Sequence, residues 1–182
     1  PYTTLFRSMP DLTDFFMYMA YDDIVSYKML SGKWIDKFKS EMSIKLMEFY
    51  RRPMRKALTD SKRFTAPYTI KQIAKLTDGH VSLGNMAGEG WFLTGEMLKL
   101  LDEGVENIIC LQPFGCLPNH VVGKGVIKEL RHCYPDSNIV AVDYDPGASE
   151  VNQLNRIKLM LSTANKNLAK QNAPEQKDQA AG

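Results

Sequence analysis

Two short apolar runs decide the fold class of this chain: Asn107-Ile108-Ile109-Cys110-Leu111 and Asn138-Ile139-Val140-Ala141-Val142. A continuous apolar run of this length is typical of a strand that is covered on both faces. A helical pattern with apolar residues at Val122, Val126, Leu130 and Cys133 lies between the runs, and another follows them. The alternation of helix and strand predicts parallel strands with right-handed crossovers in a Rossmann-like α/β layer with flanking helices.

The regions on either side of the two runs are helical in pattern. From Pro10 to about Ser61, apolar residues recur at intervals of three and four; they include Phe15, Tyr18, Met19, Ile35, Phe38, Met42, Leu46 and Phe49. Ser31-Gly32 is expected to separate two helices, and Pro53 to end or kink the second one near Phe49. Trp91 to Asp102 also has helical spacing.

The last helix is expected to begin after Ser149, which can cap it, and to bury Leu154, Ile157 and Leu161 as its core stripe. Two strands are too few for an independent sheet. The remaining strands are therefore missing, supplied upstream, or represented by a weak third strand at Val81-Ser82-Leu83.

This pattern divides the chain into four parts. Residues 1–8 look like a translated sequencing adapter, and processing to a mature N-terminus is the alternative. Residues 9–80 form a helical segment, and residues 81–165 a Rossmann-like α/β half-domain. Residues 166–182 are rich in Lys, Gln, Asn and Ala and are expected to be a disordered tail. The whole is interpreted as a fragment of a larger fold.

Composition limits the class of protein. The 182 residues are 44% hydrophobic and 24% charged, with a net charge of +2, which suits a globular core. No apolar run approaches the roughly 18 residues of a membrane span, and the first residues lack the basic stretch, apolar core and small-residue cleavage site that are typical of a secretory signal. Three cysteines with no small-scaffold spacing argue against a disulfide framework. A soluble cytoplasmic protein is expected, with no membrane partner.

Charge is distributed unevenly along the chain. Residues 33–75 contain 12 Lys and Arg against 4 Asp and Glu, whereas residues 76–165 contain 6 against 11. The basic section could face an acidic partner or nucleic acid. Its aromatic residues have helical spacing and not the spacing of a base-stacking surface, which favours a solvated helix face over a nucleic-acid site.

Ligands of open α/β sheets bind outside the carboxyl ends of the strands. The two loops expected there are Gln112 to His120 and Asp143 to Gly147. Cys116 follows Gly115 just before a helix N-terminus, where a thiolate is favoured; a metal or cluster ligand, a nucleophile and an ordinary loop thiol all remain open. Cys110 and Cys133 are expected to be small buried hydrophobes. Asp143 and Asp145 could hold a cation or a ribose, or form an ordinary turn.

Three long segments together resemble one family, and they occur in order between about residues 10 and 165. They are Gly88 to Leu93, Cys110 to His120, and Asp143 to Arg156. They closely resemble the C-terminal region of the acyl-CoA dehydratase activase-related proteins, which look like fusions of an ATP-dependent 2-hydroxyacyl-CoA dehydratase activator with a region similar to the 2-hydroxyglutaryl-CoA dehydratase D-component.

The resemblance implies a dehydratase-like fold in which cysteine thiolates hold an iron–sulfur cluster, of the 4Fe-4S type, for low-potential electron transfer in anaerobic metabolism. Cys116 matches a cluster cysteine, and Cys110 is a second candidate. Gly115, Asn119 and His120 would lie beside the cofactor. The remaining thiolates would lie upstream, and ATP would bind only to activator domains that this chain lacks. Upstream domains of a parent chain, activator or dehydratase subunits and an acyl-CoA substrate are the implied partners.

Two rival functions remain. The chain could be a non-catalytic docking module whose basic helices bind a partner and whose cysteines are structural. It could also bind a CoA nucleotide at Lys124 and a helix N-terminus.

Overall fold

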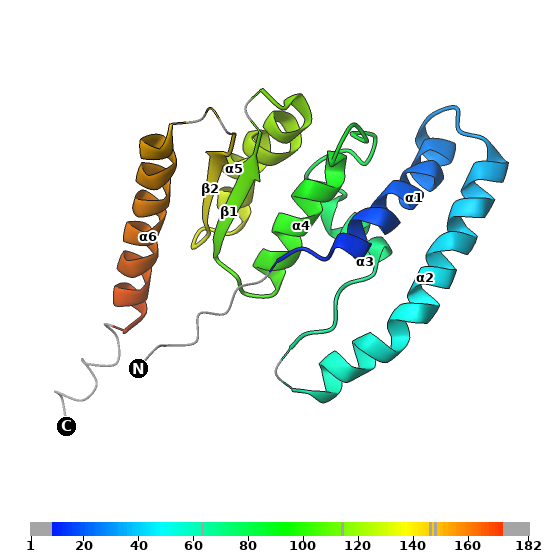
Figure 1. The fold of residues 1–182 in the computed structure, drawn as a ribbon, viewed down its shortest axis with the longest axis horizontal. Coiled ribbons are helices and arrows are strands. Elements are labelled where there is room, and N and C mark those ends of the chain that lie inside the picture. The colour runs from blue at the N-terminus through cyan, green and yellow to red at the C-terminus, as the bar shows by residue number, and fades with distance from the viewer. Residues whose placement is uncertain (1–8, 63, 114, 146, 148, 173–182) are drawn as a thin grey trace. The chain divides into compact units, whose positions relative to one another are not determined.

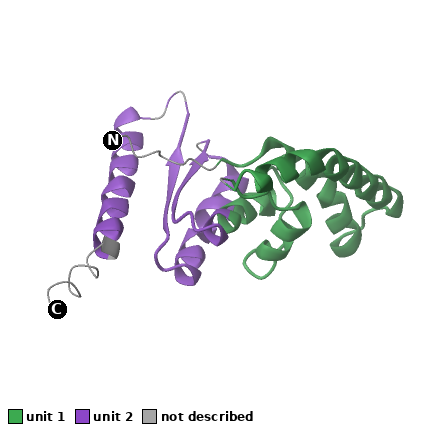
Figure 2. Ribbon diagram, turned by 90° about the horizontal axis from the view of Figure 1, so that it is seen from below, with its two compact units in different colours: residues 1–99 green, residues 100–182 purple. Residues whose placement is uncertain are grey.

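The structure is a computed structural model that describes residues 9–62, 64–113, 115–145, 147 and 149–172. The expected adapter, residues 1–8, and residues 173–182 of the expected tail lie outside these residues. The chain divides into two compact units, residues 1–99 and 100–182, shown in green and purple in Figure 2. The sequence analysis placed the boundary between the helical segment and the α/β half-domain after residue 80, whereas the boundary between the two units lies within α4 (Gly90–Asp102). The described residues contain no helix long and apolar enough to cross a membrane.

The first unit is helical (Figure 1). It contains α1 (Leu12–Met29), α2 (Trp34–Asp60), α3 (Ile70–Thr77) and most of α4. Ser31 and Gly32 separate α1 from α2, as the sequence predicted, and these two helices pack side by side. Thr69 begins α3 with a capping box to Gln72, which satisfies two main-chain donors at that end.

Aromatic side chains of α1 and α4 form the centre of this unit's core. The Tyr18 ring stacks on Phe92 with 5.2 Å between centroids and meets Trp91 edge to face at the same distance. The Tyr18 hydroxyl donates to the main-chain oxygen of Gly88 at 3.1 Å. Gly90 has a φ of +49°, and a Cβ there would lie 2.4 Å from that hydroxyl. Only glycine therefore allows α4 to start this close to α1.

Two local expectations for the first unit need correction. Of the two outcomes expected at Pro53, the end of the helix near Phe49 is wrong, because α2 continues through Pro53 to Asp60. Pro53 is exposed, so water can satisfy the Phe49 carbonyl that loses its helical donor. The described residues Val81, Ser82 and Leu83 form a bend and a turn and not a third strand.

The second unit is the α/β part. β1 (Asn107–Gln112) leads through a π-helical turn, η1 (Asn119–Gly123), and a short 3₁₀ turn, η2 (Lys124–Val126), to α5 (Ile127–Cys133). β2 (Asn138–Asp143) and α6 (Glu150–Asn172) follow. β1 and β2 pair in parallel from Asn107 opposite Asn138 to Gln112 opposite Asp143, which confirms the predicted parallel strands. The described residues form a two-stranded sheet, and most of them are helical.

The sheet is only partly covered, which corrects the expectation for β1. α5 and α6 both contact β2 and lie on opposite sides of the sheet in Figures 1 and 2. Burial alternates along β1, so that Cys110 is buried while Ile109 and Leu111 are 40% and 58% exposed. Asn138, which shares its face with these two residues, donates to the main-chain oxygen of Met160 in α6 at 2.9 Å. α6 thus covers that face over β2 and leaves it open over β1.

The expected core stripe of the last helix is also wrong. α6 begins directly after Ser149, as expected, but Leu154 and Leu161 are 44% and 55% exposed. Ile157 is partly buried, and Met160 is buried in their place. α6 also extends to Asn172, beyond the start of the expected tail.

Candidate functional site at the carboxyl edge of the sheet

The loops that follow β1 and β2 are joined by hydrogen bonds at the carboxyl edge of the sheet. Gln112, which is 1% exposed, donates from Nε2 to Oδ1 of Asp143 at 2.7 Å. The main-chain N–H of Tyr144 donates to the Gln112 carbonyl at 2.8 Å. Because parallel strands end at the same edge, the two loops predicted to carry chemistry lie next to each other.

A cavity of about 520 Å³ lies beyond the end of β2. Its described lining consists of Val142, Asp143, Asp145, Gly147, Ser149, Asn152, Gln153 and Arg156. It therefore combines two carboxylates, a guanidinium, a hydroxyl and two amides. A polar small molecule that carries both hydroxyl and anionic groups fits such a lining.

The α6 residues of this lining are fixed to the strand. Gln153 donates from Nε2 to the main-chain oxygen of Asp143 at 3.1 Å, and Arg156 donates from Nη1 to that of Ala141 at 3.0 Å. The sequence analysis assigned no site role to Asn152, Gln153 or Arg156. These three residues follow Ser149 at intervals of three, four and seven, which places them on the same side of a helix as Ser149. This spacing is the sequence signal that could have identified them.

Cys116, the predicted cluster ligand, lies in the loop after β1 and is partly buried. Its main-chain N–H donates to the Pro113 carbonyl at 3.3 Å, and Gly115 between them has a φ of +72°. A β-turn with a left-handed third residue requires glycine at that position. This turn places the thiol at the carboxyl edge, immediately before the helical turns that lead to α5.

The other predicted cofactor-binding residues surround this turn without converging on one point. Gly115 is exposed, His120 is partly buried and Asn119 is 3% exposed. Nδ1 of His120 lies 2.8 Å from the main-chain oxygen of Cys116. A carbonyl only accepts, so Nδ1 is the donor in this contact. Within the described chain, the cavity beyond β2 is not lined by Cys116 or by Gly115, Asn119 and His120.

Cys110, the second predicted ligand, is 4% exposed and lies within β1, which confirms its expected burial. Among the residues that the structure describes, neither Cys110 nor Cys116 belongs to a group of three His, Cys, Asp or Glu side chains close enough to share an ion. A cluster held by thiolates needs more ligands than these. The donor set of the described residues therefore does not fit a complete iron–sulfur cluster.

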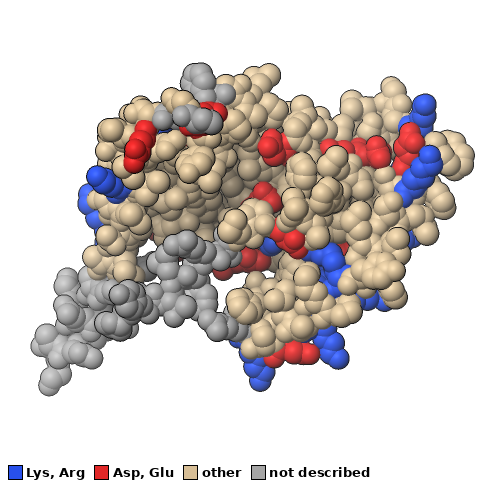
Figure 3. Space-filling model, viewed as in Figure 1, with Lys and Arg blue, Asp and Glu red and all other residues tan. Residues whose placement is uncertain are grey.

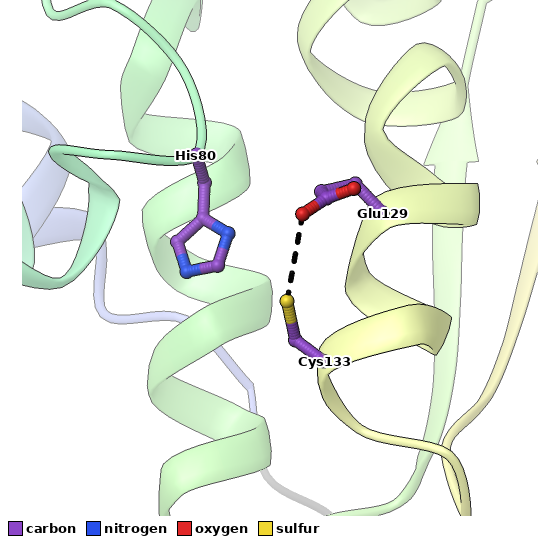
Figure 4. A group of neighbouring side chains, drawn as sticks. All are labelled: His80, Glu129 and Cys133. Carbon is purple, nitrogen blue, oxygen red and sulfur yellow. Dashed lines mark hydrogen bonds between the residues drawn. The ribbon is translucent and has the colours of Figure 1, made fainter.

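Cys133 differs from its expected role as a buried hydrophobe, because it is exposed. Its Sγ lies 3.6 Å from Oε1 of Glu129, one helical turn earlier on α5 (Figure 4). Partial desolvation and the Glu129 carboxylate raise the pKa of this thiol above its ordinary value, which disfavours a thiolate. His80, also drawn in Figure 4, belongs to the other unit.

The helical unit contains a buried charge cluster that the sequence analysis did not identify. Arg51, which is 6% exposed, pairs with Asp14 at 2.8 Å and with Asp11 at 3.2 Å. Asp14 is itself 2% exposed, and Nζ of Lys99 lies 3.8 Å from it. These pairs connect α1 with α2 and α4. Buried ionic groups that pair in this way are typical of a structural network.

Two more carboxyls of this unit have strongly shifted pKa values. Burial raises the pKa of Asp22 to about 6, although its hydrogen bond from Trp91 Nε1, at 2.9 Å, opposes the shift. Burial also raises the pKa of Glu96 to about 8. Perturbed carboxyls occur in structural networks as well as in active sites. Asp22 is held by the indole of the aromatic core, and so we assign it to packing.

No family model, curated protein or solved structure matches the chain. The likeness to the dehydratase activase-related proteins rests on its three sequence segments alone.

Proposed function

We propose that the α/β unit forms one wall of a cofactor crevice at the carboxyl edge of its sheet. In this proposal Cys116 supplies one thiolate to an iron–sulfur cluster whose other ligands come from another polypeptide segment. The chemistry would be the low-potential electron transfer that the likeness to the 2-hydroxyacyl-CoA dehydratase system implies.

The position of Cys116 carries this proposal. Its thiol is partly buried, and it follows the strand that ends beside the polar cavity. The turn at Gly115 and the contact of His120 with the Cys116 carbonyl fix the backbone on both sides of the thiol. Thiolates are the usual cluster ligands, and hydrogen bonds around them tune the potential.

The partly covered sheet supports a cofactor site that this chain shares with another segment over a site that this chain completes alone. Parallel sheets are ordinarily covered on both faces, yet the β1 residues Ile109 and Leu111 remain exposed. A further segment packed against β1 would cover them and would lie close to the loop that contains Cys116. That segment is a natural source of the missing thiolates.

The experiment compares this chain with a version extended upstream by the coding sequence at its genomic locus. Both are purified without oxygen, supplied with iron and sulfide, and analysed for metal content and visible absorption. We expect a cluster in the extended protein only. Cys116→Ala should remove most of its iron, whereas Cys133→Ala, which removes an exposed thiol of α5, should leave the iron content unchanged.

Two results would contradict the proposal. An extended protein without iron would show that no cluster is shared, and Cys116 would then be an ordinary loop thiol. A Cys116→Ala variant that keeps the full iron content would show that this thiolate is not a ligand.

A further inference from the structure

One face of α2 presents a row of large apolar side chains to solvent. The row consists of Ile35, Phe38, Met42, Leu46 and Phe49, which are 37%, 55%, 51%, 58% and 57% exposed. They are spaced three, four, four and three residues apart, so they lie within an arc of about 80° along about 21 Å of the helix. A stripe with this spacing ordinarily faces a core.

The opposite face of α2 explains why the stripe points outward. The buried residues of α2 are Ser40, Ile44 and Arg51. Ser40 donates to Asp23 of α1 at 2.6 Å, and Arg51 forms the buried ion pair with Asp14. These polar contacts fix the rotation of α2 against α1. The more apolar side of the helix is left without a partner in the described chain.

Basic side chains border this stripe. Lys39 lies on one side of it, and Lys45, Arg52 and Lys56 lie on or beside the other. The guanidinium of Arg52 lies over the Phe49 ring, 5.5 Å from its centroid. Within the described residues, none of these four takes part in an ion pair, whereas Glu41 and Glu48 of α2 are paired with Lys37 and with Arg51 and Arg55.

In Figure 3, Lys and Arg side chains (blue) occur along the margin where Figure 1 places α2, together with acidic side chains (red) and residues of all other types (tan). Contiguous exposed apolar surface bordered by charge is typical of a protein interaction site.

We propose that this stripe, Ile35 to Phe49, is the docking surface for an acidic amphipathic helix of a partner protein. The partner's apolar residues would pack between the α2 side chains, and its Asp and Glu residues would pair with the basic border. This surface lies in residues 1–99 and does not depend on the proposed cluster.

Charge selects this occupant. Trp34, Tyr50 and Met54 of α2 are also exposed and lie outside the arc of the stripe, so the stripe is the centre of a wider apolar surface. A second copy docked through the same stripe would place Lys and Arg against Lys and Arg, and like charges opposed in this way disfavour association. An acidic helix complements the basic border, and the vesicle experiment below separates it from a membrane surface.

The first test uses a labelled synthetic helix with Leu at its a and d positions and Glu at its e and g positions, and a matched peptide with Lys in place of Glu. Binding to the full chain is measured by fluorescence anisotropy at low and high salt. We expect the Glu peptide to bind at least tenfold more tightly than the Lys peptide. High salt should weaken its binding, because it screens the charged border.

Variants then locate the site. Leu46→Glu should weaken binding of the Glu peptide at least tenfold. Leu161→Glu, the same change at a similarly exposed position of α6, should leave binding within about twofold. The pair Lys45→Glu and Lys56→Glu should shift the preference to the Lys peptide, whereas Lys71→Glu with Lys75→Glu on α3 should not. Circular dichroism verifies that each variant is folded.

Three results would overturn the proposal. Equal binding of the two peptides would remove the role of the charged border. Binding to phosphatidylserine vesicles that Leu46→Glu abolishes, without binding of the Glu peptide, would assign the stripe to a membrane surface. A dimer that Leu46→Glu dissociates and the Glu peptide does not would assign it to a second copy.

Discussion

Glu96 shows how burial acts on a single residue of this protein. Its carboxyl is partly buried on α4, and burial raises its pKa from an ordinary 4.5 to about 8. Asp14 and Glu89 raise the pKa further, and Lys99 lowers it. At neutral pH the folded protein therefore keeps Glu96 mostly protonated, while the unfolded chain ionises it.

This difference makes the free energy of unfolding depend on pH. Below about pH 4.5 the Glu96 carboxyl is protonated in both the folded and the unfolded state, so its titration does not change the free energy of unfolding. As the pH rises from there through 8, the folded state must either hold the proton or bury a charge, so stability falls. Glu96→Gln removes this cost, and we expect it to stabilise the helical unit by roughly 1–3 kcal/mol at pH 8.5 and not at pH 4.

Urea unfolding followed by tryptophan fluorescence measures this effect. Both tryptophans, Trp34 and Trp91, lie in residues 1–99, so their signal reports on the unit that contains Glu96. An equal stabilisation at both pH values would contradict the titration of Glu96 as its cause.

At the scale of elements, α2 shows what periodicity predicts and what it leaves open. Its spacing of apolar residues correctly predicts a helix, and the same spacing is the usual sign of a core face. The structure turns that face outward, because the buried contacts of Ser40 and Arg51 lie on the other side. α6 behaves similarly, since hydrogen bonds from Gln153 and Arg156 to β2 set its rotation.

Pro53 provides the test at this scale. It lies inside α2, where it lacks the N–H that would bond to the Phe49 carbonyl. Pro53→Ala should restore that bond and stabilise the helical unit by roughly 1–3 kcal/mol in urea unfolding. Pro67→Ala, in the loop before α3, is the control and should give no gain, because it only increases the freedom of the unfolded chain. A loss of stability in Pro53→Ala would mean that the helix bends there to make its contacts with α1.

At the scale of the whole molecule, the main feature is the face of β1 that no other described element of the α/β unit covers. Ile108 and Ile109 are neighbours of the same type on opposite faces of the strand, 5% and 40% exposed. Ile109→Thr should change the free energy of unfolding by no more than about 0.5 kcal/mol and reduce self-association of the chain. Ile108→Thr should cost roughly 2–4 kcal/mol, because it buries a hydroxyl and leaves a cavity.

Denaturant unfolding followed by far-ultraviolet circular dichroism measures both variants, and light scattering measures self-association. Equal losses in the two variants would show that Ile109 is covered in solution. In that case the shared site proposed at this edge would lose its structural support.

The sequence by itself determined the elements. Local spacing predicted the two strands and their parallel order, the helices around them, and the break between α1 and α2, because these depend on residues close together in the chain. It also predicted the loops after β1 and β2 as the place for chemistry, since ligands of open α/β sheets bind outside the carboxyl ends of the strands. The roles of Cys116, Gly115, Asn119 and His120 at a cluster stay predictions.

Only the tertiary structure decided which face of each element is buried. The rotation of α2 depends on an ion pair between Arg51 and Asp14, and that of α6 on Arg156 and the carbonyl of Ala141. These partners lie far apart in the sequence, and their contacts are polar, so apolar spacing carries no information about them. For the same reason, the sequence did not predict the hydrogen bond between Gln112 and Asp143 or the lining of the cavity beyond β2. Only the tertiary structure shows them.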